Sequence, residues 1–152
     1  MTDARDREPF SYRSDPAVPA FPDDRPVFVF DGHCVMCSAG ARMVLRHDRR
    51  GRIRLLPSQS PLGQAVYRHY GLDADRTSLL IEDGRVRIRS DAMIRLAELL
   101  GPAWSAAGAL RLAPRVLLDA VYDRVAHNRL RLFGRREVCY LAEPGQEDRF
   151  LG

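Results

Sequence analysis

Cys34 and Cys37 form a Cys-x-x-Cys motif, the residue pattern in this chain with the clearest chemical potential. The motif lies between a short apolar run, Val27 to Phe30, and a helical-looking stretch, Ala39 to His47. A cysteine that opens a helix meets unpaired backbone N–H groups and the positive end of the helix dipole, which favour the thiolate. A second cysteine one turn later can attack a mixed disulfide on the first. The spacing predicts dithiol chemistry with Cys34 as nucleophile and Cys37 as resolving thiol.

The periodicity of the following helix predicts how the two sulfurs differ in exposure. Cys37, Ala41, Val44 and Leu45 recur at helical spacing and share the face expected to pack on a sheet. We therefore expect Cys37 to be buried and Cys34, at the helix tip, to be exposed.

Two polar residues near the motif are candidate supporting groups. Asp31 could accept or relay a proton during release by Cys37, because a carboxylate at the end of a buried strand often has a raised pKa. Alternatively, Asp31 and Gly32 form a common turn pair and nothing more. A protonated His33 would lower the pKa of the Cys34 thiol, unless its side chain points away.

A metal site is the main alternative for the cysteine pair. A structural zinc site needs four ligands, usually as two spaced pairs. The remaining candidate ligands are scattered along the chain: His33, His47, His69, His127 and Cys139. We expect a redox dithiol without a cofactor, and retain as alternative a partner-docking module that binds Zn(II) or Cu(I) through the pair.

Length and composition indicate a single domain with its own apolar core. The chain has 152 residues, of which 45% are hydrophobic, enough for a core without disulfides. The cysteine number is odd, and no secretory signal pattern is recognisable near the N-terminus. No apolar run reaches membrane-spanning length. We expect a soluble, cytoplasmic protein with reduced thiols.

Charge is unevenly distributed along the chain. All 24 basic residues are arginine and the net charge is +4. Residues 42–54 and 111–136 are each arginine-rich, whereas residues 1–24 carry an acidic excess. Such a pattern can attract nucleic acid, but no zinc finger, glycine-rich RNA motif or aromatic interleaving supports it. We expect solvated helix faces and no nucleic-acid partner.

Hydrophobic patterning predicts an α/β protein with a thioredoxin-like βαβαββα three-layer core. The expected elements are a strand at 27–30, a helix at 39–47, a strand at 53–56, a helix from Pro61 to a stop at Gly71, a hairpin of 78–81 and 86–89, and a helix from a Ser90 cap to Gly101-Pro102. Two further helices, at 104–112 and 114–129, and an irregular arginine-rich tail follow.

Three segments follow from this order. Residues 1–25 carry four prolines among acids and arginines without apolar periodicity, so we expect a flexible or loosely docked arm. Residues 26–142 form the thioredoxin-like domain with its C-terminal helical extension. Residues 143–152 form a tail.

The motif, taken with two later segments, resembles the DCC family of small thiol-disulfide oxidoreductases. Residues 29–37 carry the D-G-x-C-x-x-C start, residues 84–92 resemble the family's middle segment, and residues 128–136 with Cys139 resemble its C-terminal part. The resemblance implies protein-disulfide oxidoreductase activity on a thioredoxin-like fold. The resemblance does not imply substrates. From the dithiol itself we expect a disulfide-containing protein or a small-thiol substrate, and the electron donor stays open.

The chain differs from thioredoxin in two places. Val35 and Met36 replace the usual Gly-Pro between the cysteines, which leaves the redox direction open; our working expectation is the reductase direction. Thioredoxins place a cis-proline beside the dithiol, and the equivalent position here is Arg76. Arg76 could stabilise the Cys34 thiolate or simply be a surface residue. Cys139 is either a second resolving or regulatory thiol or a small buried hydrophobe.

Overall fold

The core of the protein is a four-stranded mixed sheet in a computed structural model that describes residues 3–135, 142 and 144–151. The strand order is β2-β1-β3-β4, with β1 parallel to β2 and the other pairs antiparallel. The strands are β1 (Val27–Phe30), β2 (Arg54–Pro57), β3 (Leu79–Glu82) and β4 (Arg85–Ile88).

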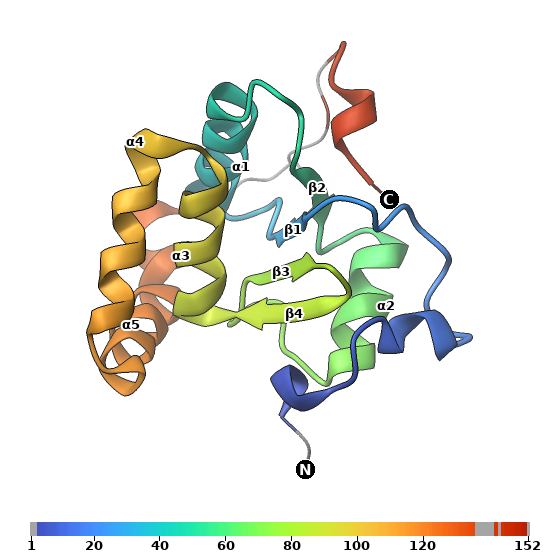
Figure 1. Cartoon of the computed structure of the whole chain (residues 1–152), viewed down its shortest axis with the longest axis horizontal. Coiled ribbons are helices and arrows are strands. Elements are labelled where there is room, and N and C mark those ends of the chain that lie inside the picture. Colours follow the sequence, from blue (N-terminus) through green and yellow to red (C-terminus); the bar gives the residue numbers. More distant parts are fainter. Residues whose placement is uncertain (1–2, 136–141, 143, 152) are drawn as a thin grey trace.

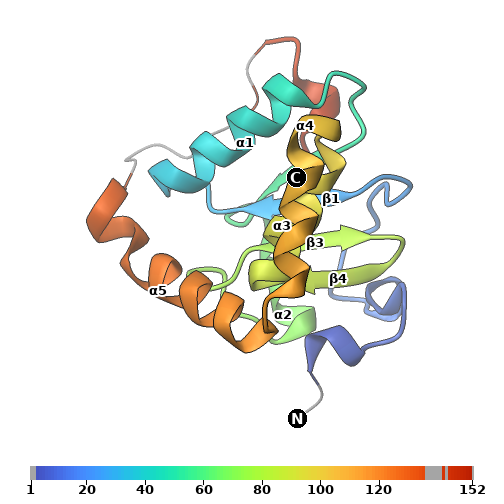
Figure 2. The same ribbon diagram turned by 60° about the vertical axis from the view of Figure 1, so that its left-hand side comes forward.

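Helices cover both faces of the sheet. The α-helices are α1 (Val35–His47), α2 (Pro61–Tyr70), α3 (Arg89–Leu99), α4 (Pro102–Ser105) and α5 (Arg115–Phe133); the 3-10 helices are η1 (Ala4–Asp6), η2 (Ser11–Ser14), η3 (Ala106–Leu112) and η4 (Glu147–Arg149). Helix α2 lies on one face, and α1 and α3 lie on the other (Figure 1). The C-terminal end of α5 approaches the N-terminal end of α1 near the end of β1 (Figure 2).

The alternation of side chains along β1 produces these layers. Val27 and Val29 pack in the cluster that contains α2, whereas Phe28 and Phe30 pack in the cluster that contains α1 and α3. All four side chains are buried. The predicted thioredoxin-like βαβαββα order is confirmed, and β1 has the expected bounds.

Local capping signals explain α2 but not α3. Ser60 accepts a hydrogen bond from Gly63 N–H at 3.0 Å, and Gly71 ends α2 in the left-handed region with a φ of 66°. The predicted Ser90 cap is wrong: α3 begins at Arg89 without a side-chain cap. The Ser90 hydroxyl instead donates to Asp119 of α5 at 2.5 Å, so a tertiary contact replaces the local one.

The N-terminal arm docks more closely than the expected loose arm. Tyr12 is 2% exposed, stacks on Phe21 at 5.1 Å between ring centroids, and donates a hydrogen bond to Asp23. Ala4 and Val18 join the same core cluster as α2. Sequence periodicity missed this docking because the arm contributes single side chains rather than an amphipathic element.

The C-terminal tail also packs on the domain. Arg149 donates to the Asp48 carboxylate at 2.8 Å and to the Ile53 carbonyl. Phe150 forms a parallel bridge with Leu55 of β2. The described part of the tail therefore covers the free edge of β2.

The C-terminal helices differ from their predicted bounds. The segment expected as one helix at 104–112 divides into α4 and η3, and α5 extends to Phe133 rather than ending at Arg129. The first part of the expected irregular tail is therefore helical. Within the described residues, no helix is both long and apolar enough to cross a membrane.

Candidate active site

The dithiol lies where β1 meets α1. Cys34 is the N-cap of α1, and its Sγ accepts a hydrogen bond from the backbone N–H of Cys37 at 3.3 Å. The Cys34 carbonyl accepts from Ser38 N–H at 2.9 Å, which begins the helical hydrogen-bond ladder. The first sulfur therefore occupies the position in which an N-cap side chain stabilises a helix.

The predicted exposures of the two cysteines are reversed in the structure. Cys34 is fully buried, at 0% exposure, whereas Cys37 is partly exposed. The chain that follows α5 covers Cys34: Arg135 forms an antiparallel bridge with Cys34, and Gly134 accepts a hydrogen bond from Val35 N–H at 3.4 Å. Periodicity within α1 identified the sheet-facing side but could not indicate a covering segment about 100 residues later.

The Cys37 thiol has an unusually high affinity for its proton. Burial and then the adjoining Cys34 sulfur raise the pKa of the Cys37 thiol well above its usual value. Cys37 therefore holds its proton at neutral pH. This arrangement places a protonated thiol beside the sulfur that caps the N-terminus of α1.

Asp31 is the polar centre of the turn that leads into α1. Its Oδ1 accepts from His33 N–H at 2.9 Å and from Gln59 Nε2 at 2.5 Å, and its side chain is nearly buried. Gln59 Oε1 accepts from Gly32 N–H at 3.0 Å, which ties this turn to the segment after β2. The turn-forming alternative for Asp31 and Gly32 thus has direct structural support.

Arg129 of α5 supplies the positive charge at this site. It is 2% exposed, and its Nη2 donates to Asp31 Oδ2 at 3.1 Å across 98 residues of sequence. Burial lowers the pKa of Arg129, but Cys37, Cys34 and Asp31 raise it more, so the net shift is upward. The guanidinium and the two sulfurs therefore lie close enough to interact electrostatically.

Sequence reasoning assigned Arg129 to a solvated segment. A signal was present nevertheless: Tyr122, Ala126 and Arg129 follow one helical face at i, i+4 and i+7, and Ala126 and Arg129 are buried. An arginine that continues an apolar stripe needs a charged partner inside the protein.

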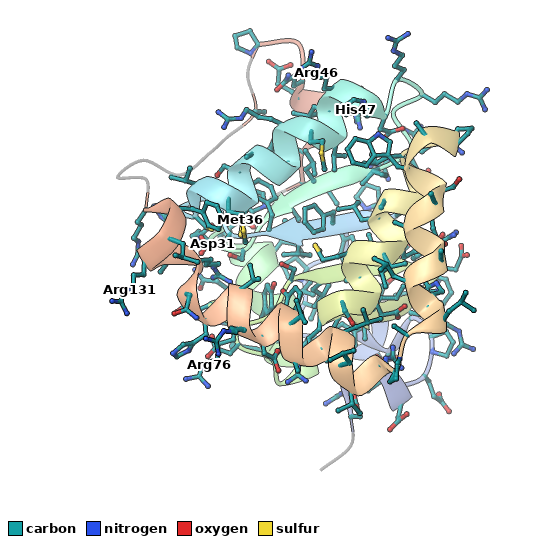
Figure 3. The ribbon with its side chains drawn as sticks, turned by 90° about the vertical axis from the view of Figure 1, so that its left-hand side faces the viewer. Asp31, Met36, Arg46, His47, Arg76 and Arg131 are labelled. Atoms are coloured by element: carbon teal, nitrogen blue, oxygen red, sulfur yellow. The ribbon has the colours of Figure 1, made fainter. Side chains whose placement is uncertain are left out.

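Arg76 is not placed to stabilise a thiolate at Cys34. Its guanidinium pairs with Asp73 at 3.6 Å, and its side chain is 76% exposed. In the view of Figure 3, Arg76 lies across α5 from Asp31 and Met36. The structure therefore favours the surface-residue alternative for Arg76.

The segment before β3 is covered by side chains of two helices. Ser78 N–H donates to the Tyr122 hydroxyl at 2.7 Å, and the Tyr67 hydroxyl donates to the Thr77 carbonyl at 2.6 Å. Thioredoxins expose this backbone beside the dithiol. In this protein, a side chain of α5 already takes one of its hydrogen-bond donors, Ser78 N–H.

Some expectations about the site remain as predictions. Cys139 lies outside the described residues, and the contribution of the His33 ring stays a prediction. Within the part of the chain that the structure describes, no group of three or more His, Cys, Asp or Glu side chains could hold a metal ion. The described cysteines, Cys34 and Cys37, are both free thiols.

Fold and dithiol together define a thioredoxin-like protein whose Cys-x-x-Cys motif opens the first core helix. The sequence model of the DCC1-like thiol-disulfide oxidoreductase family matches residues 28–135. The chain belongs to this family.

Two curated relatives are similar to this chain, and the name of one of them states the DCC family. "Uncharacterized protein YuxK" of Bacillus subtilis (strain 168) is 33% identical over 127 residues, which cover 82% of this chain and 93% of the relative. "DCC family protein At1g52590, chloroplastic" of Arabidopsis thaliana is 35% identical over 122 residues, which cover 78% of this chain and 71% of the relative. No solved structure matches the chain with comparable significance.

Proposed function

We propose that this protein is a thiol-disulfide oxidoreductase in which Cys34 is the nucleophile and Cys37 is the resolving thiol. The observation that carries the proposal is the contact between the pair: Cys34 Sγ accepts the N–H of Cys37 at the start of α1. Because the pKa of Cys37 is raised, Cys37 keeps its proton at neutral pH until the resolving step. A thiolate beside a protonated thiol is the resting arrangement that stepwise exchange requires.

The reaction proceeds in two exchanges in the reductase direction. The Cys34 thiolate attacks one sulfur of a substrate disulfide, forms a mixed disulfide and releases the first substrate thiolate. Cys37 then attacks Cys34 Sγ, which forms the Cys34–Cys37 disulfide and releases the second substrate sulfur; the Cys37 proton passes to this departing sulfur, and water protonates the first substrate thiolate. The substrate disulfide is reduced to two thiols, and the protein dithiol is oxidised.

Two neighbours of the dithiol support this sequence. The positive charge of Arg129 favours the thiolate, and Asp31 holds Arg129 in place through its Oδ2. Cys34 is fully buried, so the bridge between Cys34 and Arg135 must open before a substrate sulfur can reach Cys34. Substrates are disulfide-containing proteins or small disulfides, and the protein acts in a reducing compartment such as the cytoplasm.

Trapping from cell extract tests the division of roles. Cys37→Ser accumulates mixed disulfides through Cys34 because the release step is lost, whereas Cys34→Ser neither traps partners nor turns over. Cys139→Ser behaves like the unmodified chain. Non-reducing electrophoresis with mass-spectrometric mapping reads out each cross-link. Equal trapping by the two active-pair variants would contradict the assigned roles.

A metal assay separates the proposal from the metal-binding alternative. Protein purified without chelator carries no stoichiometric Zn(II) or Cu(I), and equilibration in glutathione buffers yields a defined reduction potential. Tightly bound metal, together with unfolding on chelation, would favour the binding module instead.

A further inference from the structure

An apolar pocket of about 220 Å³ adjoins the dithiol. It lies between α1, α3 and α5, and Cys37 forms part of its wall. The wall of the pocket is mostly apolar and includes Met36, Met93 and Val125. A group attached to a sulfur that reacts at this dithiol can therefore enter an apolar environment.

One residue of the pocket wall carries a buried polar atom that lacks a hydrogen-bond partner among the described residues. Arg129 lines the pocket and uses Nη2 on Asp31, but its Nε is buried and unpaired among the described residues. An unsatisfied buried donor costs free energy, and such atoms are rare in native proteins. A ligand that brings an acceptor oxygen beside its apolar group would satisfy this donor.

We propose that this pocket binds an apolar side chain adjacent to the reacting cysteine of a peptide or protein substrate. Arg129 Nε donates to a backbone carbonyl of the same substrate segment. The inference rests on the proposed function, and it names the substrate class: disulfides flanked by apolar residues.

The size of the pocket favours a single side chain. Pockets that enclose drug-sized ligands span about 300–1,000 Å³, so a space of about 220 Å³ is too small for a large cofactor. The backbone carbonyl of a peptide supplies the acceptor that a purely hydrocarbon ligand lacks.

The surface beyond the pocket favours a peptide over an isolated small molecule. Val125 is partly exposed at the pocket, and Val121 and Leu117 continue along α5 at intervals of one turn, also exposed. This apolar strip extends the pocket along the helix. A polypeptide can occupy both at once.

Gly40 of α1 offers a way to fill the pocket without disturbing the fold. It lines the pocket, and a Cβ added there would meet no atom within 4 Å. Leucine is a good helix former, so Gly40→Leu is compatible with α1. Ala39→Leu places a similar side chain at the preceding, exposed position of α1, outside the pocket, and serves as the matched control.

The experiment compares two peptides that differ only beside their single cysteine. One has leucine on both sides of the cysteine and the other has serine, and each is supplied as a mixed disulfide with a nitrothiobenzoate leaving group. Reduced protein should release nitrothiobenzoate from the leucine peptide at least about tenfold faster than from the serine peptide. Gly40→Leu should bring this ratio close to one, and Ala39→Leu should preserve it.

The outcomes separate the pocket from the underlying function. Exchange with neither peptide would overturn the proposed function and the pocket with it. Exchange at equal rates with both peptides would overturn only the proposed binding of an apolar side chain in the pocket. A leucine preference that persists in Gly40→Leu would overturn it as well. Circular dichroism of each variant confirms that the compared proteins are folded.

Discussion

The buried pair of Asp31 and Arg129 joins the turn before the dithiol to α5. Both side chains are nearly inaccessible to solvent, with side-chain exposures of 7% and 3%. Removing one partner of such a pair leaves an uncompensated charge inside the protein, which is more costly than the pair is favourable. The pair therefore matters for stability as well as for the charge next to the sulfurs.

Replacement of Arg129 measures this dependence. Arg129→Met should lower the free energy of unfolding by about 3–5 kcal/mol, because Asp31 remains buried without its cation. Arg131→Met, an exposed position on the same helix, should change it by less than about 0.5 kcal/mol. Urea denaturation of both variants gives the comparison. A loss for Arg129→Met as small as the loss for Arg131→Met would mean that Asp31 can stay buried without its cation at no cost.

The raised pKa of Cys37 predicts a pH dependence of stability. The folded protein retains the Cys37 proton at pH values where the unfolded chain has lost it, so stability falls as pH rises above about 8.5, the usual thiol pKa. Cys37→Ser should remove this part of the decline. Denaturation of the reduced proteins at intervals between neutral pH and about pH 10 measures it; parallel profiles would contradict the shift.

Two glycines show that α2 packs much more closely on its neighbours at Gly63 than α1 does at Gly40. A Cβ at Gly63 of α2 would lie 2.3 Å from the Pro57 carbonyl oxygen, whereas a Cβ at Gly40 of α1 would meet nothing within 4 Å. The first approach is backbone against backbone, so no side chain can move aside. Helix α2 therefore depends on glycine for its contact with the end of β2, and α1 does not depend on Gly40 for packing.

Alanine at the two positions should have opposite effects. Gly63→Ala should lower the free energy of unfolding by about 1–3 kcal/mol or more, because the added methyl group forces α2 away from β2. Gly40→Ala should raise it by about 0.4–1 kcal/mol through the reduced entropy of the unfolded chain. Thermal unfolding of both variants measures the two shifts. Destabilisation by both would indicate that α1 packs more tightly than the structure shows.

Elements with complete local signals could be predicted from the sequence, and tertiary contacts could not. The apolar run of β1 and the Ser60 and Gly71 signals of α2 depend on neighbouring residues alone, and each was predicted at its observed place. Ser90 carried an equally good cap signal, but it bonds to a helix later in the chain. Local rules describe what a segment can do in isolation, and packing decides among the options.

The same limit applies to the candidate site. The Cys-x-x-Cys motif and its place at the start of a helix are local, and both were predicted. Arg129 reaches Asp31 across 98 residues, and the exposures of the cysteines reversed because Arg135 covers Cys34. Such contacts depend on where α5 crosses the domain, which no periodicity within α5 specifies.

At the scale of the whole molecule, both ends of the chain complete the domain. The N-terminal arm joins the cluster on the α2 face, and the tail covers the β2 edge through Phe150 (Figure 1). The arm is held by buried aromatic surface and by its hydrogen bonds: Phe10 N–H donates to the Gly84 carbonyl at 2.8 Å. The arm is thus an integral part of the α2 side of the core.

Tyr12 allows a direct measurement of how much the arm contributes. Tyr12→Ala should lower the free energy of unfolding by about 3–5 kcal/mol, because it removes a fully buried ring and leaves a cavity beside Phe21. Tyr12→Phe keeps the ring and loses the hydrogen bond to Asp23, so its cost should be about 1 kcal/mol. Urea denaturation ranks the two variants. If Tyr12→Ala unfolds at the same urea concentration as the unmodified chain, the arm does not dock in solution, and the α2 face must be stable without it.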